Sequence, residues 1–386
     1  MTRFTSAVLV LCMCALSPLH GVTADRHHVA IGNVVTRTVQ PLMRRYGIPG
    51  MAVGVVINGK TYVYDYGVAS KATTAPVTRA TLFEIGSVTK TFTATLAAYA
   101  QLRGKISLSD RVGNDLPSLR GSSFDRVSLL DLGTHTAGGL PLQVPDGITN
   151  DAQLISYLQH WKPAYKPGTY RVYSNVSIGL LGLIVAHRMN QNFDTLMQAT
   201  LLQPLGLKHT YLDVPAAQTV NYAQGYTSKD LPIRMAPGVL GPEAYGIRTT
   251  AGDLLSFLAA NMGMLDLDAT VQRALTDTHT GYYRVGAMTQ DLIWEQYRYP
   301  VTLVQLREGN SPTLLFDANP VTALDPPSPP RDDVVLNKTG STNGFSAYVA
   351  FSPAKKIGIV LLANKSYPID ARVSAAYAIL TQLEGR

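Results

Sequence analysis

Cysteine is almost absent from this 386-residue sequence. The only two, Cys12 and Cys14, lie within the first 14 residues. If this segment is removed, the remaining chain can form neither a disulfide nor a thiolate metal site. The eight histidines show no His-x-x-x-His spacing, which argues against a zinc-dependent hydrolase. We therefore expect no metal and no cofactor.

Charged residues are also few. They make up 15% of the chain and form no cluster of Lys and Arg, although the formal net charge is +7. This modest positive excess does not indicate a nucleic-acid partner and favours anionic small molecules. Internal repeats and low-complexity tracts are lacking as well. Hydrophobic residues reach 46%, enough for a large core or for two closely joined domains.

The first 24 residues have the composition of a secretory signal peptide. Arg3 precedes an apolar run over residues 6–19, and small residues at 22–24 provide a cleavage site after Ala24. The apolar run is too short and too interrupted to span a membrane comfortably. Cleavage would reduce the formal charge from +7 to +6, because Arg3 is the only charged residue removed. Export, a large core and no disulfides indicate a bacterial periplasmic protein without a membrane anchor.

Hydrophobic periodicity predicts helices near both ends and through the middle, and strands only near the ends. Asn58-Gly59 lies between the first two strands, where it predicts a hairpin turn. The proline-rich segment 318–331 is expected to be an irregular connector. The predicted helices cover residues 30–45, 91–102, 127–133, 177–189, 251–262 and 371–383, and the predicted strands cover 51–57, 61–67, 334–338, 345–351 and 357–362.

The strands near the two ends of the chain must pair with one another across the helical middle. This predicts an α+β fold, with one antiparallel sheet of about five strands flanked by the terminal helices and a mostly helical domain inserted. The sheet part would comprise about residues 25–85 and 306–386, and the helical part about residues 86–305. The crevice between the two parts is the expected site.

The stretch around Ser87 carries the first chemical signature. Residues 91–102 are apolar and Ala-rich, so Ser87 would lie at the N-terminus of a buried helix. Lys90 lies one turn further on the same face, within reach of the serine hydroxyl. A serine needs a neighbouring base to become a nucleophile. A second Ser-x-x-Lys, at 352–355, falls between two predicted strands and is expected to be a turn.

Two further motifs support Ser87 as a functional residue. Tyr173-Ser174-Asn175 immediately precedes a predicted helix, and Lys338-Thr339-Gly340 ends a predicted strand. Ser-x-x-Lys, Tyr-x-Asn and Lys-Thr-Gly in this order resemble the penicillin-recognising serine enzymes. The similarity extends over residues 30–384 and is greatest to class C β-lactamases. The flanking segments that carry it are 49–54, 83–87, 136–143, 245–246 and 343–345.

Tyr173 can act as a base if it lies between Lys90 and Lys338. Deprotonating a free phenol at pH 7 costs about 4 kcal/mol. One cation at about 4 Å in an effective dielectric of about 20 offsets about 4 kcal/mol, and a second cation leaves a margin for desolvation. Whether Lys90 or Tyr173 takes the first proton stays open at this stage.

The resemblance implies the rest of the site. Ser87, Lys90, Tyr173 and Lys338 would be catalytic, and the backbone N–H groups of Ser87 and Ser341 would form an oxyanion hole. The amide of the substrate's side chain would contact Asn175, Gln143 and Tyr245. Its carboxylate would face Lys338, Thr339 and Arg372, next to Gly340, whose lack of a side chain allows close backbone approach.

Other residues near these motifs are expected to be structural. Ile369 departs from the resemblance, because many relatives have Asn there, and its side chain cannot donate a hydrogen bond to a carboxylate. We expect His135 and Glu84 to be structural. Glu243 and Arg248 are expected to be solvated loop residues. Asn175 is expected to be a helix N-cap in addition to any binding role.

The resemblance implies hydrolysis of β-lactam antibiotics, mainly cephalosporins, through a covalent acyl-serine intermediate. The enzyme would be a periplasmic monomer that confers antibiotic resistance. The alternative is a D-Ala-D-Ala carboxypeptidase or an esterase on the same fold, although those relatives often have His or Trp where this chain has Lys338. A class A β-lactamase would have Ser-Asp-Asn as its second motif. A binding protein without catalysis is disfavoured, because four residues expected to be catalytic are intact: Ser87, Lys90, Tyr173 and Lys338.

Overall fold

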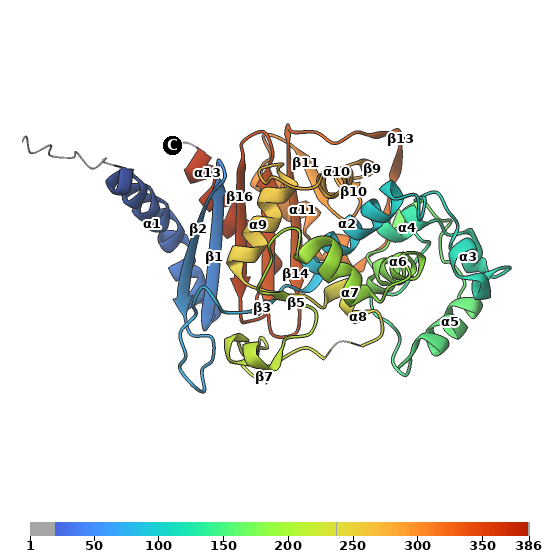
Figure 1. Cartoon of the computed structure of the whole chain (residues 1–386), viewed down its shortest axis with the longest axis horizontal. Coiled ribbons are helices and arrows are strands. Elements are labelled where there is room, and N and C mark those ends of the chain that lie inside the picture. The colour runs from blue at the N-terminus through green and yellow to red at the C-terminus, as the bar shows by residue number, and fades with distance from the viewer. Residues whose placement is uncertain (1–19, 237, 385–386) are drawn as a thin grey trace, which may run out of the picture.

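The computed structural model describes residues 20–236 and 238–384 (Figure 1). Its centre is an antiparallel sheet that contains nine strands in the described part of the chain, in the order β13-β9-β10-β11-β14-β15-β16-β1-β2. These strands are β1 (Gly50–Ile57), β2 (Lys60–Gly67), β9 (Gly281–Val285), β10 (Met288–Asp291), β11 (Glu295–Arg298), β13 (Thr322–Ser328), β14 (Val334–Ser341), β15 (Ser346–Ser352) and β16 (Ile357–Ala363). The α+β class predicted from the sequence is confirmed.

Shorter strands form small satellite sheets. They are β3 (Phe83–Glu84), β4 (Tyr170–Arg171), β5 (Thr210–Tyr211), β6 (Gly225–Tyr226), β7 (Pro232–Ile233), β8 (Arg248–Thr249) and β12 (Asn319–Pro320). Strand β3 pairs with β8, and the chain then enters the segment that contains Ser87.

The helices lie on both faces and at one end of the sheet. They are α1 (His20–Tyr46), α2 (Thr89–Leu102), α3 (Val112–Asp115), α4 (Leu129–Gly133), α5 (Asp151–His160), α6 (Asn175–Arg188), α7 (Phe193–Met197), α8 (Gly241–Tyr245), α9 (Ala251–Asn261), α10 (Ala269–Asp277), α11 (Leu303–Gly309), α12 (Pro312–Phe316) and α13 (Ile369–Glu384). None of the helices within residues 20–236 and 238–384 combines the length and apolarity that a bilayer span requires. The predicted signal peptide falls mainly on residues 1–19, which lie outside the described residues.

The five strands predicted from the sequence occupy neighbouring positions, β14-β15-β16-β1-β2. The first two form the predicted hairpin, with Ile57 opposite Lys60. Both turn residues have positive φ, 49° at Asn58 and 79° at Gly59, as the favoured two-residue hairpin turn requires. The pairing of β1 with β16 then joins the first part of the chain to the last.

The sheet is larger than predicted, because β9, β10 and β11 lie in residues 281–298, a region expected to be helical or irregular. These strands are only four or five residues long and have buried polar residues such as Gln290 and Gln296, so they lack an apolar pattern. The proline-rich connector was also predicted wrongly in part, since β13 pairs with β9. The register is interrupted between Ala323 and Ser328, which lets the prolines there avoid ladder hydrogen bonds.

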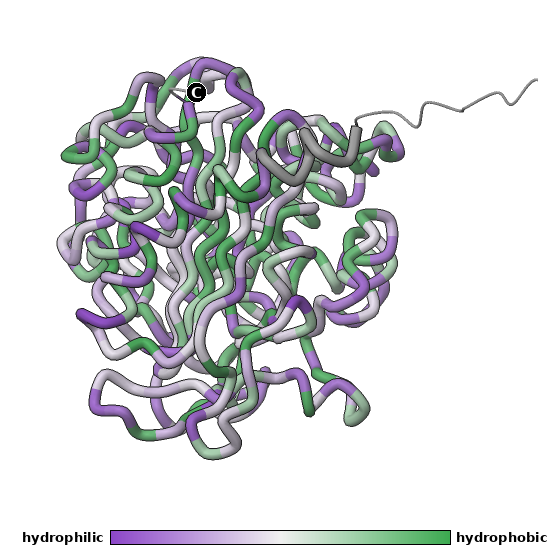
Figure 2. The backbone as a smooth tube through the Cα atoms, turned by 90° about the vertical axis from the view of Figure 1, so that its left-hand side faces the viewer, coloured by the Kyte–Doolittle hydropathy of each residue, from purple (hydrophilic) through white to green (hydrophobic). Residues whose placement is uncertain are grey.

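Both faces of the sheet are covered. Strand β1 places Ala52 and Val56 in one core, which also contains residues of α2, α6 and α9. Its alternate residues Met51, Val53 and Val55 enter a second core with residues of α1 and α13. In Figure 2 the strands in the middle of the molecule are correspondingly hydrophobic. The sheet is therefore the middle of three layers.

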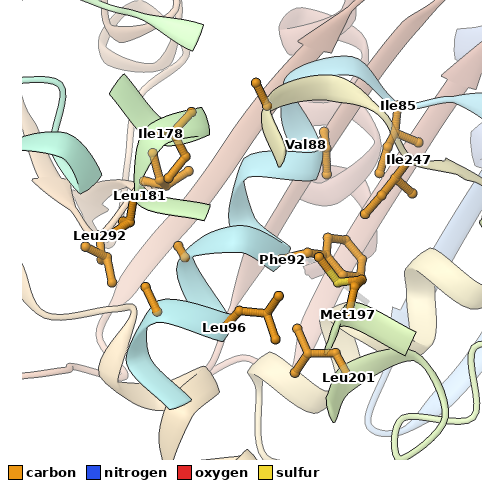
Figure 3. Close-up of a cluster of buried hydrophobic side chains, with 14 of the residues drawn as sticks. Ile85, Val88, Phe92, Leu96, Ile178, Leu181, Met197, Leu201, Ile247 and Leu292 are labelled. Atoms are coloured by element: carbon orange, nitrogen blue, oxygen red, sulfur yellow. The ribbon is translucent and has the colours of Figure 1, made fainter. Parts of the chain in front are cut away.

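Helix α2 is the buried helix predicted after Ser87. Figure 3 shows Val88, Phe92 and Leu96 packed among apolar side chains from neighbouring elements. The ring of Phe92 stacks on Phe257 of α9 with 3.8 Å between centroids. Packing on several sides fixes α2, so the residues at its N-terminus have a rigid support.

Candidate active site

Ser87 lies in a single 3₁₀ turn, Gly86–Val88, that leads directly into α2. Two glycines allow the end of β14 to approach this turn. A Cβ on Gly86, which has φ +49°, would lie 2.6 Å from the backbone N and O of Ser341. A Cβ on Gly340 would lie 1.9 Å from the carbonyl oxygen of Ile85. The first and third motifs are therefore in direct backbone contact.

Lys90 is fully buried, and its Nζ lies 2.8 Å from the Oγ of Ser87. The same ammonium donates to the carbonyl oxygen of Ala244 in α8, also at 2.8 Å. Burial lowers the pKa of Lys90 to about 8, and the Lys338 ammonium acts in the same direction while Tyr173 opposes it. Lys90 is therefore mostly protonated at pH 7 and acts as a donor to Ser87 Oγ.

Tyr173 lies between the ammonium groups of the first and third motifs. Tyr173 is 4% exposed, and its ring centroid is 5.3 Å from Lys90 Nζ and 5.0 Å from Lys338 Nζ. Burial raises the pKa of the Tyr173 phenol, but the charges of Lys338 and Lys90 and a hydrogen bond with Ser87 outweigh it, so the pKa is lowered. The structure thus brings the expected catalytic residues together around a phenol that ionises more easily than a free tyrosine.

Behind Tyr173 lies an ion-pair network that the sequence did not predict. Glu295 Oε1 is 3.3 Å from both Lys338 Nζ and an Arg171 nitrogen, and all three side chains are buried. Burial lowers the pKa of Lys338, but Glu295 and Tyr173 raise it more, so Lys338 remains protonated. The guanidinium carbon of Arg171 is 5.3 Å from the centroid of Tyr173. Glu295 belongs to no motif, whereas Arg171 precedes Tyr173 by two residues and could have been suspected from alternation along an extended segment.

The second motif also carries an amide pair. Asn175 Nδ2 donates to Gln143 Oε1 at 2.9 Å, while the buried Asn175 Oδ1 has no hydrogen-bond partner within the described residues. The predicted N-cap role of Asn175 is wrong. Ser174 is the N-cap of α6, because its hydroxyl accepts from Ser177 N at 3.1 Å. Tyr245 ends α8 and is half-buried.

The third motif lines a small cavity beside the ion-pair network. The cavity has a volume of about 20 Å³, and its lining includes Tyr173, Lys338, Thr339, Glu295 and Ile369. Ile369, the first residue of α13, lines this cavity together with Lys338 and Thr339, the residues that were expected to face a substrate carboxylate.

Arg372 does not have the environment that was expected. It is 2% exposed and donates to the carbonyl oxygens of Gly340 at 2.6 Å, Tyr367 at 2.7 Å and Ala347 at 3.2 Å. It also donates to Ser341 Oγ at 3.1 Å. The guanidinium is thus engaged with the end of β14 instead of facing the cleft, because α13 packs against the sheet at this point.

Glu243 and Arg248 are buried, so their prediction as solvated loop residues is wrong. Arg248 donates to the carbonyl oxygens of Leu212 at 2.5 Å and Gly246 at 2.9 Å. Burial raises the pKa of Glu243 to about 7. Short segments around α8 pack between α2 and α6, which a sequence pattern of loop residues does not reveal.

His135 packs against the tyrosine of the second motif. Its ring centroid is 4.4 Å from that of Tyr173, and its Nδ1 is 3.3 Å from the backbone N of Ser174. Burial lowers the pKa of His135 well below its usual value, and the cations Arg171, Lys90 and Lys338 add to this effect. The His135 ring is therefore neutral and acts as a packing partner for the Tyr173 ring.

No group of three or more His, Cys, Asp or Glu residues arranged to hold a metal ion occurs in the part of the chain that the structure describes. The arrangement contains the parts needed for acyl transfer: a serine near a base, flanking cations, and backbone N–H groups beside the serine.

Comparisons with known proteins agree with this geometry. Residues 35–384 match the Beta-lactamase family. A β-lactamase of Pseudomonas fluorescens is 52% identical over 354 residues, which cover 92% of this chain and 99% of that protein. A crystal structure of a class C β-lactamase in complex with cefoxitin is 53% identical, with a TM-score of 0.90, and the match covers 92% of this chain and 99% of the other.

A further solved structure carries a different activity in its name. The D-alanine carboxypeptidase AmpC from Burkholderia cenocepacia is 56% identical, with a TM-score of 0.89, over 93% of this chain and 99% of that chain. The family match spans most of the chain and includes all three motifs. The protein therefore belongs to the beta-lactamase family.

Proposed function

We propose that this protein is a class C serine β-lactamase that hydrolyses β-lactams, mainly cephalosporins, through an acyl-enzyme on Ser87. The proposal rests on the arrangement of the four catalytic side chains. Lys90 Nζ lies 2.8 Å from Ser87 Oγ, and Tyr173 lies between Lys90 and Lys338. Family membership and the relative whose structure contains cefoxitin support the same reaction.

In acylation, Ser87 Oγ forms a bond to the lactam carbonyl carbon and its proton passes to the phenolate of Tyr173. Lys90 is the weaker candidate for base, because it is mostly protonated and donates to Ser87. The ring C–N bond then breaks, and Tyr173 returns the proton to the leaving nitrogen. The N–H groups of Ser87 and Ser341 stabilise the tetrahedral oxyanion.

Deacylation uses the same phenolate. Tyr173 takes a proton from water, which attacks the ester carbonyl carbon, and Tyr173 returns this proton to Ser87 Oγ as the ester C–O bond breaks. Lys338 and Thr339 bind the substrate carboxylate, whereas Asn175, Gln143 and Tyr245 bind its amide side chain. We assign Arg372 to holding the end of β14, because its guanidinium donates to Gly340 O and Ser341 Oγ.

A second candidate function is D-Ala-D-Ala carboxypeptidase activity. The carboxypeptidase of Burkholderia cenocepacia shares 56% of its residues with this chain, and the same serine, base and oxyanion hole can cleave a peptide bond. An esterase would use the same groups. The two main reactions differ in the bond that breaks: a lactam C–N bond, whose nitrogen stays attached to the acyl group, or a peptide bond, whose D-Ala departs.

We further propose that residues 1–24 are a signal peptide and that residues 25–386 act as a periplasmic monomer. The composition of the first 24 residues supports export. N-terminal sequencing of the protein recovered from the periplasm should begin at Asp25.

The decisive experiment compares steady-state hydrolysis of a cephalosporin, a penicillin and a D-Ala-D-Ala peptide. We expect the cephalosporin to have the highest kcat/KM, and Ser87→Ala to retain less than about a thousandth of it, since losing a hydroxyl nucleophile costs about a millionfold. A higher kcat/KM for the peptide would favour the carboxypeptidase, and substantial activity of Ser87→Ala would exclude Ser87 as nucleophile.

A further inference from the structure

The turn after β14 contains Ser341, and it is held by a buried carboxylate from a distant part of the chain. Strand β14 ends at Ser341 and β15 begins at Ser346, with Thr342 N donating to Phe345 O at 3.1 Å. Ser341 itself is exposed. An exposed turn moves more easily than a strand, whereas a donor in an oxyanion hole must already be in place when negative charge develops.

Glu84 supplies the contact that restrains this turn. Its Oε2 accepts a hydrogen bond from Thr342 Oγ1 at 2.5 Å. Its Oε1 accepts from Tyr222 Oη at 2.5 Å and from the backbone N of Met235 at 2.9 Å. Glu84 is 1% exposed, so these donors replace the water that a carboxylate would otherwise bind.

The short distances indicate strong contacts. Hydrogen bonds from hydroxyls to carboxylates at 2.5–2.7 Å are roughly twice as strong as those between neutral groups. Burial raises the pKa of Tyr222, and the neighbouring Glu84 raises it further, so the phenol stays protonated and remains a donor. Arg248 Nε lies 3.4 Å from Tyr222 Oη and adds a cation behind the phenol.

Ser341 is restrained on its other sides as well. Arg372 donates to Gly340 O at 2.6 Å and to Ser341 Oγ at 3.1 Å. Gly86 leaves no space for a side chain between itself and the Ser341 backbone. Thr342 is thus the contact through which the turn beyond Ser341 is tied to β3.

Glu84 also precedes Ser87 by three residues. The short segment from β3 to the 3₁₀ turn therefore carries both the nucleophile and the group that holds the opposite backbone. We infer that Glu84, acting through the Thr342 hydroxyl, positions the Ser341 N–H opposite that of Ser87, so that Glu84 and Thr342 are positioning residues for the oxyanion hole. The inference rests on the proposed function and assigns Glu84 more than a structural role.

The test uses two variants of Thr342. Thr342→Val keeps the side-chain shape and removes the hydroxyl that donates to Glu84, whereas Thr342→Ser keeps that hydroxyl. Phenylboronic acid is the probe, because it adds to a serine hydroxyl as a tetrahedral boronate with an oxygen in the oxyanion hole. The matched control is Thr278→Val, which removes a buried hydroxyl that donates to Leu275 O at 2.6 Å outside the site. The Tm of each variant is recorded alongside.

We expect Thr342→Val to raise the dissociation constant of phenylboronic acid about tenfold and to lower kcat for a cephalosporin by a similar factor. This is less than the 10²–10³-fold cost of losing an oxyanion donor outright, because the N–H is misplaced but still present. Thr342→Ser should stay within about twofold of wild type. Thr278→Val should lower the Tm without changing phenylboronic acid binding.

Two outcomes would overturn the inference: unchanged phenylboronic acid binding in Thr342→Val, or an equal loss in Thr342→Val and Thr342→Ser. Turnover by the wild type tests the proposed function separately. If the wild type did not hydrolyse the cephalosporin, a weaker phenylboronic acid complex in Thr342→Val alone would still support positioning by Thr342.

Discussion

Replacing Glu295 by Gln should destabilise the fold and shift the pH dependence of the reaction. Glu295 Oε1 lies 3.3 Å from both Lys338 and Arg171, and all three groups are buried. At an effective dielectric of about 20, each attraction is about 5 kcal/mol before desolvation is counted. Removing one partner of a buried ion pair costs about 3–5 kcal/mol, because a buried charge loses its compensation. We expect a loss of this size in the free energy of unfolding.

The same substitution should change the basicity of Tyr173. Glu295 raises the pKa of this phenol, so its removal lowers the pKa further and leaves Lys338 and Arg171 uncompensated. The acid limb of kcat should therefore move to lower pH, while a less basic phenolate should lower the maximal rate.

The assays are urea unfolding and a kcat–pH profile with a cephalosporin. The control is Glu308→Gln, which removes an exposed carboxylate from α11. If Glu295→Gln unfolds at the same urea concentration as Glu308→Gln and its acid limb does not move, the Glu295 ion pairs neither stabilise the fold nor tune Tyr173. An acid limb that moved to higher pH would contradict the assigned sign of the interaction.

Three further predictions concern single side chains. Tyr173→Phe should slow decay of the acyl-enzyme at least as much as its formation, as single-turnover mass spectrometry can resolve; decay at the wild-type rate would mean another base activates water. Ile369→Asn should increase the affinity of carboxylate-bearing inhibitors more than that of carboxylate-free ones, since a hydrogen bond from the new amide to a charged acceptor contributes about 1.5–3 kcal/mol. Equal changes in the affinities of the two inhibitor classes would mean that Ile369 does not line that subsite. Asp291 is fully buried without a partner in the described chain, and burial holds its pKa well above the usual value. The wild type therefore loses stability as pH rises above the pKa of this carboxyl in the unfolded chain, whereas Asp291→Asn does not. The free energy of unfolding of Asp291→Asn should rise relative to wild type by up to about 1.4 kcal/mol per pH unit, as urea unfolding from pH 5 to 8 can measure. A difference between the two proteins that does not depend on pH would contradict this.

Much of the fold could be predicted because the relevant signals are local. Apolar periodicity predicted α2, and Asn58-Gly59 predicted the hairpin of β1 and β2, since positive φ at both turn residues requires such a pair. Strands β9 to β11 could not be predicted in this way. They are short and partly polar inside, so their place in the sheet depends on pairing with β14.

The ion pairs around Tyr173 could not be predicted from the sequence either, because they join residues that are far apart along the chain. Glu295 comes from β11, Arg171 from β4 and Lys338 from β14. Arg171 lies two residues before Tyr173, but no sequence spacing links Glu295 to either cation. The resemblance of the chain to class C β-lactamases predicted that Arg372 faces the substrate carboxylate. In the structure α13 packs against the sheet, and the Arg372 guanidinium donates to the carbonyl oxygen of Gly340 at the end of β14 instead.

The motifs, the family and the five neighbouring strands β14, β15, β16, β1 and β2 could be inferred from the sequence alone. These features depend on residue type, short spacing and hydrophobic periodicity, all of which are properties of neighbours along the chain. The charges around Tyr173 and the contacts that hold Ser341 follow from the tertiary structure. Desolvation and Coulomb interactions depend on distance and burial in space, and the fold brings Glu84 to Thr342 across 258 positions of the chain.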